Sequence, residues 1–351
     1  MNKQVQGARR SAWLGLAGSG ALLALTMLQV LMVQVLLQVL AQGAALAQGT
    51  AQAWPTRPIL AVIPFSAGNA NDVVGRVVLD QLSQQLGEPI VIENRAGAGG
   101  TTGVAFVAKA PPDGYTILVH SSTFSAGQAI YKSLPYDTLH DFASIIPLGL
   151  QPTVLVASPS KGWKTVADLI AAAKAKPGAL TFASAGIGSA SHLAAERLRF
   201  SAGFNALHVP YRGPNEALAD VITGRIDFYF LPIAPALPLI NDGKLVALAV
   251  STANRAATLP NVPTTAEAGL KDAAYHFWTG LFVPVETPKN IIAKLYDETR
   301  KALDVPSVQE RLMKLGVDPM PMGTAEFDAY FRDDVRSTVK LVRDAGIPQT
   351  E

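Results

Sequence analysis

One stretch, residues 57–82, constrains the fold more than any other part of the chain. Ile59 to Ile63 is a short apolar run, typical of a strand that is buried on both faces of a parallel sheet. A loop of small and amide residues follows, from Phe65 to Asn71. Apolar residues at helical spacing then predict a helix that begins near Asn71 or Asp72, with Asn71 as its N-cap. The stretch therefore predicts one strand–loop–helix unit of an α/β sheet.

The loop of this unit has two interpretations. Bare N–H groups and the positive end of a helix dipole make a helix N-terminus suitable for a carboxylate of a small ligand. The same pattern is also an ordinary strand-to-helix turn, which every α/β domain contains. Asp72 and Arg76 stand four residues apart. They predict either a surface ion pair or an aspartate that orients loop amides or water.

A second unit of the same kind follows later in the chain. Residues 180–183 predict a strand, and residues 184–192 form another small-residue loop that leads into a predicted helix over residues 193–200. Two such loops, one in each of two domains, suit a two-lobed protein that holds an anion between its lobes. The donors that we expect from the second loop are Ser184, Gly186 and Ser189.

A length of 351 residues suits two domains that follow a leader. The predicted first domain combines residues 54–152 with residues 279–351, and the second spans residues 153–278. Residues 1–53 begin with Lys3, Arg9 and Arg10 and continue without charge to two small-x-small cleavage patterns, as in a signal peptide for export to the periplasm. Residues 13–32 are also long enough to span a bilayer, so an uncleaved membrane anchor is the alternative.

Composition excludes several function classes. Without the leader the chain has 26 basic and 27 acidic residues, which gives no electrostatic reason to expect nucleic acid. The absence of cysteine excludes disulfides, thiolate catalysis and cysteine-ligated metals. No cluster has metal-ligand spacing, and the glycines of residues 97–103 fit close backbone packing better than a dinucleotide site. We therefore expect no cofactor and no metal.

Catalytic motifs are likewise missing from the sequence. Ser189 and His192 stand one helical turn apart, so a serine nucleophile with a histidine base is conceivable. No orienting carboxylate accompanies them, and a histidine at a helix start more often bonds locally. Tyr211 and Arg212 are candidates for lining the cleft, although a solvated loop arginine explains Arg212 equally well. We expect a protein that is not an enzyme.

Several ordered motifs resemble the Bug family, the periplasmic solute-binding components of tripartite tricarboxylate transporters. The resemblance covers nearly everything from Trp54 to Ile347. Each motif alone is weak, and their order and spacing together are specific. The motifs are Pro64-Phe65-Ser66-Ala67-Gly68 with Asp72 and Arg76; Glu93-Asn94-Arg95 with Gly97 and Gly100; Pro112-Asp113-Gly114-Tyr115; Tyr136-Asp137 with Asp141-Phe142; Ser191-His192-Leu193; Val209-Pro210-Tyr211-Arg212-Gly213; and Pro260 to Glu267 with Gly269.

The resemblance implies a two-lobed Venus-flytrap α/β fold of the type II periplasmic binding class. It implies that loops 65–71 and 184–189 hold one carboxylate of a small solute, partly through water, and that a membrane permease receives the solute. We expect a monomer; a periplasmic sensor for a signalling partner and an enzyme on the same scaffold are the alternatives. Two departures from the family pattern, Asn69 for a glycine and Leu231 for an aspartate, affect the expected ligand. The predicted ligand-binding residues are Phe65, Ser66, Ala67, Asn69, Asn71, Asp72, Ser121, Thr123, Ser184, Gly186, Ser189, His192 and Tyr211.

Overall fold

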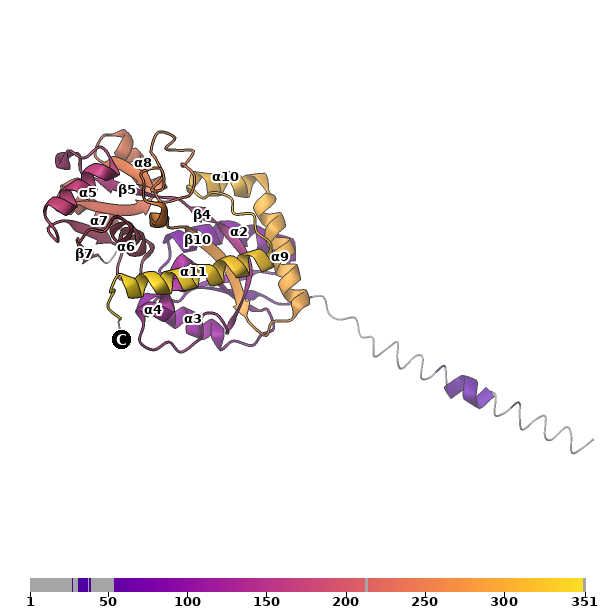
Figure 1. Cartoon of the computed structure of the whole chain (residues 1–351). Helices are drawn as coiled ribbons and strands as arrows, with labels where there is room; N and C mark the ends of the chain where they lie inside the picture. The colour runs from indigo at the N-terminus through magenta and orange to yellow at the C-terminus, as the bar shows by residue number, and fades with distance from the viewer. Residues whose placement is uncertain (1–26, 28–30, 37, 39–53, 212–213, 350–351) are drawn as a thin grey trace, which may run out of the picture. The chain divides into compact units, whose positions relative to one another are not determined.

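The structure is a computed structural model that describes residues 54–211 and 214–349, together with Met27, residues 31–36 and Gln38 (Figure 1). Most of the predicted leader, and Arg212 and Gly213, lie outside the described residues. Within the described part, no helix has both the length and the apolar character that a membrane crossing needs. Contacts divide the chain into residues 1–56 and 57–351. The fold below is that of the second unit.

The first sheet has five strands in the order β2-β1-β3-β10-β4. β1 is parallel to both β2 and β3, whereas β10 is antiparallel to both β3 and β4. β10 thus returns from late in the chain and lies between two strands that are consecutive in sequence. The strands are β1 (Ile59–Ile63), β2 (Ile90–Asn94), β3 (Thr116–Ser121), β4 (Phe142–Gln151) and β10 (Phe277–Pro284).

Helices cover both faces of this sheet (Figure 1). α2 packs on one face, where Gly75 approaches Ile63 and Val119. α3 and α11 cover the other face, and their apolar side chains share a core with Val62 and Leu118. The helical elements of this part are α2 (Ala70–Leu86), η1 (Ala98–Gly100), α3 (Thr101–Ala108), η2 (Ser122–Ala126), α4 (Gly127–Ile130), α9 (Lys289–Asp304), α10 (Pro306–Lys314) and α11 (Thr324–Asp344).

The second sheet repeats this plan with the order β7-β6-β8-β5-β9. β6 is parallel to β7 and β8, and β5 is antiparallel to β8 and β9. α5 and α6 share one core with the sheet, and α7 and α8 share another. The strands are β5 (Thr153–Ala157), β6 (Thr181–Ser184), β7 (Leu207–Pro210), β8 (Phe228–Pro232) and β9 (Val246–Val250). The helical elements are η3 (Pro159–Lys161), α5 (Val166–Ala175), α6 (Ala190–Ala202), α7 (Pro214–Ile222), α8 (Ile233–Asn241) and η4 (Lys271–Ala273).

The chain passes from the first sheet to the second at Pro152, the single residue between β4 and β5. It returns before Phe277, where β10 begins. Because residues 57–351 form one unit by contacts, the domain boundaries at residues 153 and 279 stay predictions. The sheets and their helices confirm the predicted α/β class.

Several local predictions can be compared with the structure. The strand from Ile59 to Ile63 has the predicted bounds. The close-packing explanation of the glycine-rich segment holds at Gly103, where an added Cβ would lie 2.8 Å from Pro64 Cβ and 2.9 Å from Arg95 O. Leu231, the departure from the family aspartate, is a core residue of β8 with 1% exposure. It therefore serves packing inside the second sheet.

Candidate ligand-binding site

Asn69 is the N-cap of α2, so the predicted cap at Asn71 is wrong by two residues. The Asn69 Oδ1 accepts the N–H of Asn71 at 2.8 Å and that of Asp72 at 3.2 Å, while its Nδ2 donates to Ser66 O at 2.6 Å. Asparagine is a favoured cap because its short side chain reaches these amides. Both polar ends of Asn69 are thereby used within its own loop, and its contact with a ligand stays a prediction.

The buried carboxylate of Asp72 stabilises the same loop through hydrogen bonds. Its carboxylate accepts the backbone N–H of Gly68 at 2.8 Å, both Oδ atoms contact Arg76 Nε at 2.9–3.0 Å, and Asn94 Nδ2 donates to it at 2.9 Å. Burial acts to raise the pKa of Asp72, but the hydrogen bonds from Arg76, Gly68 and Asn94 outweigh it and hold the pKa below its usual value. Asp72 therefore combines the two predicted roles, because it pairs with Arg76 and also orients a loop amide.

Asn71 joins the first loop to two strands. Its Nδ2 donates to Ser121 Oγ at 3.1 Å, and its Oδ1 accepts from Thr279 Oγ1 at 3.3 Å. Ser121 Oγ also contacts Thr123 Oγ1 at 3.0 Å. These predicted ligand residues therefore contact one another, and Asn71 and Ser121 are buried.

Free amides remain at the tip of the loop. Among the described residues, no acceptor is recorded for the backbone N–H groups of Phe65, Ser66 and Ala67. Asp72 accepts the amide of Gly68, and Asn69 accepts the amides of Asn71 and Asp72. The first loop can therefore present up to three N–H donors to an anion beside a helix N-terminus.

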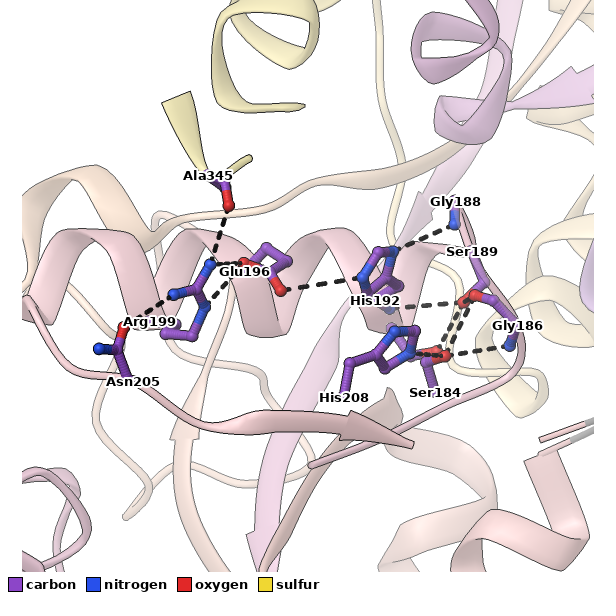
Figure 2. A network of polar contacts seen from close by, with 11 residues as sticks. Ser184, Gly186, Gly188, Ser189, His192, Glu196, Arg199, Asn205, His208 and Ala345 are labelled. Carbon is purple, nitrogen blue, oxygen red and sulfur yellow. Dashed lines mark hydrogen bonds and ion pairs between the residues drawn. The ribbon is translucent and has the colours of Figure 1, made fainter. Parts of the chain in front are cut away.

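The second loop has the same local design (Figure 2). Ser189 is the N-cap of α6, and its Oγ accepts the N–H of His192 at 3.4 Å. Gly188 donates its N–H to His192 Nδ1 at 3.1 Å. The amides of Ala185 and Gly186 donate to Ser191 Oγ and Ser184 Oγ, respectively. Within the described part of this loop, Ile187 keeps an N–H for which no acceptor is recorded.

A buried histidine, His192, and a half-buried one, His208, lie beneath this loop (Figure 2). The His192 and His208 rings stack with 3.9 Å between their centroids, and His208 Nε2 lies 2.6 Å from Ser184 Oγ. Burial lowers the pKa of His192 to about 3 and that of His208 to about 4. Both rings are therefore neutral near pH 7.

The geometry gives no nucleophile–base pair at Ser189 and His192. Ser189 Oγ contacts the backbone N–H of His192, whereas the ring nitrogen Nδ1 is occupied by Gly188. His192 Nε2 is 3.8 Å from Glu196, which pairs with Arg199 at 2.6 Å. The histidine thus has the local hydrogen-bonding role that we weighed against catalysis.

A pocket of about 210 Å³ is lined by residues of both loops. Of the predicted ligand-binding residues, Phe65, Thr123 and Ser189 line it. The others lie around or beneath the loops and are outside the lining. These are Ser66, Ala67, Asn69, Asn71, Asp72, Ser121, Ser184, Gly186, His192 and Tyr211.

Sequence reasoning missed part of the lining. His120, Ile130, Tyr131 and Tyr136 all contribute to the pocket. His120 could have been found from its place at the end of β3, one residue before the predicted Ser121. The two tyrosines belong to the irregular segment between β3 and β4. The sequence of such a segment does not predict which way a side chain points.

Tyr211 contacts the second loop through its backbone, since its N–H donates to Ser184 O at 2.9 Å. Its hydroxyl donates to Asp220 at 2.7 Å. Burial and that hydrogen bond raise the pKa of Tyr211 to about 12. In the described ranges, no group of three or more His, Asp or Glu side chains is placed to hold a metal ion.

Comparisons with known proteins agree on one family. The model of the tripartite tricarboxylate transporter family receptor matches residues 74–347. A protein of Pseudomonas sp. (strain P51), described as a UPF0065 protein in the tcbD-tcbE intergenic region, is 38% identical over 291 residues, 83% of this chain and 87% of that protein.

Solved structures also match. R. palustris Rpa4515 with adipate is 30% identical, with a TM-score of 0.75 over 85% of this chain and 100% of that one. MatC from Rhodopseudomonas palustris with bound malate is 32% identical, with a TM-score of 0.72 over 82% and 100%. The predicted family and the two-lobed periplasmic binding protein fold are thereby confirmed.

Proposed function

The chain belongs to the tripartite tricarboxylate transporter receptor family, and from this we propose that it captures a small carboxylate-bearing solute outside the cytoplasm and delivers it to a tripartite tricarboxylate-type permease. Two similar structures are described with adipate and malate, both of which are carboxylates. The proposal places the protein in the periplasm, with residues 1–53 as its export signal, and involves no chemical conversion of the solute.

The observation that carries this proposal is one pocket shared by two helix-start loops. Phe65 comes from the loop before α2, and Ala185, Gly188 and Ser189 come from the loop before α6. A carboxylate held there would accept from the free loop amides of residues 65–67 and from the Ile187 amide. Each hydrogen bond to a charged acceptor contributes roughly 1.5–3 kcal/mol. The predicted ligand-binding residues outside the lining would then act by shaping these loops.

Capture would follow from closure of the two loops around the solute. Pro152 and residues 251–276 are the connections that could bend, because they join the two sheets. Gly188 shows how closely the second loop approaches α4. A Cβ added there would lie 2.6 Å from Ile130 Cδ1, and Gly188 has a φ of +76°, which a larger residue rarely adopts.

A binding experiment on two glycine variants tests the proposal. Carboxylic acids are screened by thermal shift, and the best ligand is measured by calorimetry with the wild-type protein, Gly188→Val and Gly203→Ala. Gly203 also has a positive φ, +64°, but nothing within 4 Å of its added Cβ, so it controls for backbone strain alone. We expect Gly188→Val to weaken binding at least about tenfold, whereas Gly203→Ala binds like the wild type.

The screen itself decides the ligand class. A bound carboxylate raises the melting temperature by an amount that grows with the logarithm of its concentration relative to Kd. If neutral solutes raise the melting temperature and no carboxylate does, the proposed anion capture is wrong. Delivery is tested separately, by asking whether deleting the gene for this chain abolishes uptake of the identified acid.

A further inference from the structure

The described lining of the pocket contains no Asp, Glu, Lys or Arg side chain. It is rich in rings and aliphatic groups, namely Phe65, His120, Phe124, Tyr131, Tyr136 and Ile130, beside the hydroxyl side chains of Thr101, Thr123 and Ser189. A second carboxylate buried among these groups would have no cationic partner in the described lining, and an unpaired buried charge is strongly disfavoured. The lining therefore favours an apolar body over a second charge.

His120 supplies a neutral donor inside this apolar wall. The residue is 3% exposed, and its ring stacks on Phe124 with 4.8 Å between the centroids. Its Nδ1 accepts the backbone N–H of Ser121 at 2.8 Å, so the proton of the neutral ring is on Nε2. Burial lowers the pKa of His120 to about 3, which keeps the ring neutral near pH 7. Among the described residues, no acceptor is recorded for that Nε2–H.

The wall also has the dimensions and geometry of a ring site. Phe65 meets His120 edge to face, with 5.3 Å between the centroids and an interplanar angle of 89°. An apolar cavity of about 150 Å³ is large enough to bind benzene. The pocket of about 210 Å³ thus has room for one aromatic ring and a carboxylate.

We propose that the solute is an acid with one carboxylate on an aromatic body, and that His120 is a specificity residue that donates from Nε2–H to a neutral acceptor on that body. The carboxylate lies at the free amides of the two loops. The ring lies among Phe65, His120 and Tyr131, and a hydroxyl group on the ring meets His120. This inference rests on the proposed capture of a carboxylate and names its chemical class.

Calorimetry on the full chain tests the class with four probes, namely benzoate, 4-hydroxybenzoate, cyclohexanecarboxylate and adipate. We expect both aromatic acids to bind more tightly than adipate by about a hundredfold, because the second carboxylate of adipate would be buried without a partner. We expect cyclohexanecarboxylate to bind more weakly than the aromatic acids and more tightly than adipate. If adipate binds more tightly than either aromatic acid, the inference is overturned while carboxylate capture stands. If none of the four probes binds, the inference is overturned, and the wider screen of carboxylic acids decides carboxylate capture.

The role of His120 is tested by a ratio of affinities. In the wild type, 3- or 4-hydroxybenzoate should bind more tightly than benzoate by roughly two- to tenfold, the effect of one neutral hydrogen bond. In His120→Phe the aromatic stack with Phe124 is kept, and this preference should disappear while benzoate still binds. A His120→Phe protein that binds benzoate and keeps the full preference contradicts the role.

A second variant covers the case in which His120→Phe does not fold. In Tyr131→Ala the ring itself is lost, and benzoate should weaken by more than about tenfold while adipate changes less. Equal losses for benzoate and adipate in Tyr131→Ala would contradict an aromatic site.

Discussion

The loops before α2 and α6 share one pattern of hydrogen bonds, which we call the frame. The acceptor in this frame is charged in the first loop and neutral in the second. In the first, Gly68 precedes the cap and donates its N–H to Asp72, the third residue of α2. In the second, Gly188 precedes the cap and donates to His192, the third residue of α6. Both glycines have positive φ, +81° and +76°. The conformation of the loop therefore depends on an acceptor at this helix position, and either a carboxylate or an imidazole supplies it.

The partners of the two acceptors continue the contrast. Asp72 pairs with Arg76 four residues later, and His192 faces Glu196 at the same spacing. A side chain from the neighbouring parallel strand completes each frame. Asn94 at the end of β2 bonds Asp72, and His208 in β7 stacks on His192. The first loop is thus held by an ion pair and the second by neutral rings, which makes them differ in their response to mutation and to pH.

The largest expected effect comes from breaking the ion-pair frame. Asp72→Ala leaves Arg76, Asn94 and the Gly68 amide without their common acceptor, and Asp72 is 2% exposed. We expect a loss of about 3 kcal/mol in the free energy of unfolding, the lower end for breaking a buried pair because Arg76 is half exposed. Urea denaturation measures it.

Asp333→Ala is the matched control for this variant. Asp333 pairs with Arg336 on α11, and both side chains are at least 70% exposed. Removal of such a surface pair should cost no more than about 0.5 kcal/mol. Similar losses in the two variants would show that the Asp72 frame has no special role.

The second expected effect is a difference between the two loops in how they make stability depend on pH. The folded pKa of His192 lies below its unfolded value of 6.5, so the unfolded chain binds more protons and stability falls as pH drops from about 6.5 toward 3. One such histidine contributes at most about 1.4 kcal/mol per pH unit. His192→Asn keeps an acceptor for Gly188 and cannot titrate. We expect the slope of the unfolding free energy against pH, between pH 6 and pH 4.5, to decrease by the contribution of one bound proton, about 1.4 kcal/mol per pH unit.

Asp72→Asn is the comparison from the first loop. The folded pKa of Asp72 lies below its ordinary value of 3.8, so its contribution is complete above that value and is lost only as pH falls further. The slope between pH 6 and pH 4.5 should therefore stay unchanged in Asp72→Asn, although the protein is less stable throughout. A changed slope there would mean that the first loop also titrates in this window.

The smallest expected effect is the difference in stability between loss of the Asn69 cap and loss of the Ser189 cap. Asn69 accepts two amides, at 2.8 and 3.2 Å, whereas Ser189 accepts one at 3.4 Å. Loss of a cap typically costs about 1 kcal/mol. We expect Asn69→Ala to lose somewhat more than this and Ser189→Ala about half as much, as measured by thermal unfolding without ligand. If Ser189→Ala loses more stability than Asn69→Ala, the hydrogen-bond geometry of a cap does not determine how much it stabilises its loop.

Local patterns predicted much of this architecture. The apolar run from Ile59 to Ile63 forms the expected strand, because nearby residues determine it. Thr165 and Asp168 form a capping box at the start of α5. Thr264 and Glu267 form the same reciprocal hydrogen bonds, yet a turn follows in place of a helix. A cap signal thus indicates where a helix can start and does not provide the apolar face that stabilises one.

The errors have identifiable physical causes. The apolar residues at helical spacing begin at Val73 and therefore predict the cap at Asn71, whereas Asn69 makes the capping hydrogen bonds two residues earlier. α8 holds two prolines, a residue type that usually indicates a loop. Pro235 lies in its first turn, where a proline costs no hydrogen bond, whereas Pro238 lies inside the helix. The contact of Ser184 with His208 depends on strand pairing, which residue spacing along the chain does not reveal.

The place of β10 has a consequence for the order of folding. The second sheet takes all its strands from residues 153–250, one continuous stretch of chain. The first sheet needs residues 277–284 between β3 and β4, so those two strands lack their shared neighbour until that late segment arrives. Pairing between segments distant in sequence is slow. The second sheet can therefore close first, and the insertion of β10 then completes the molecule.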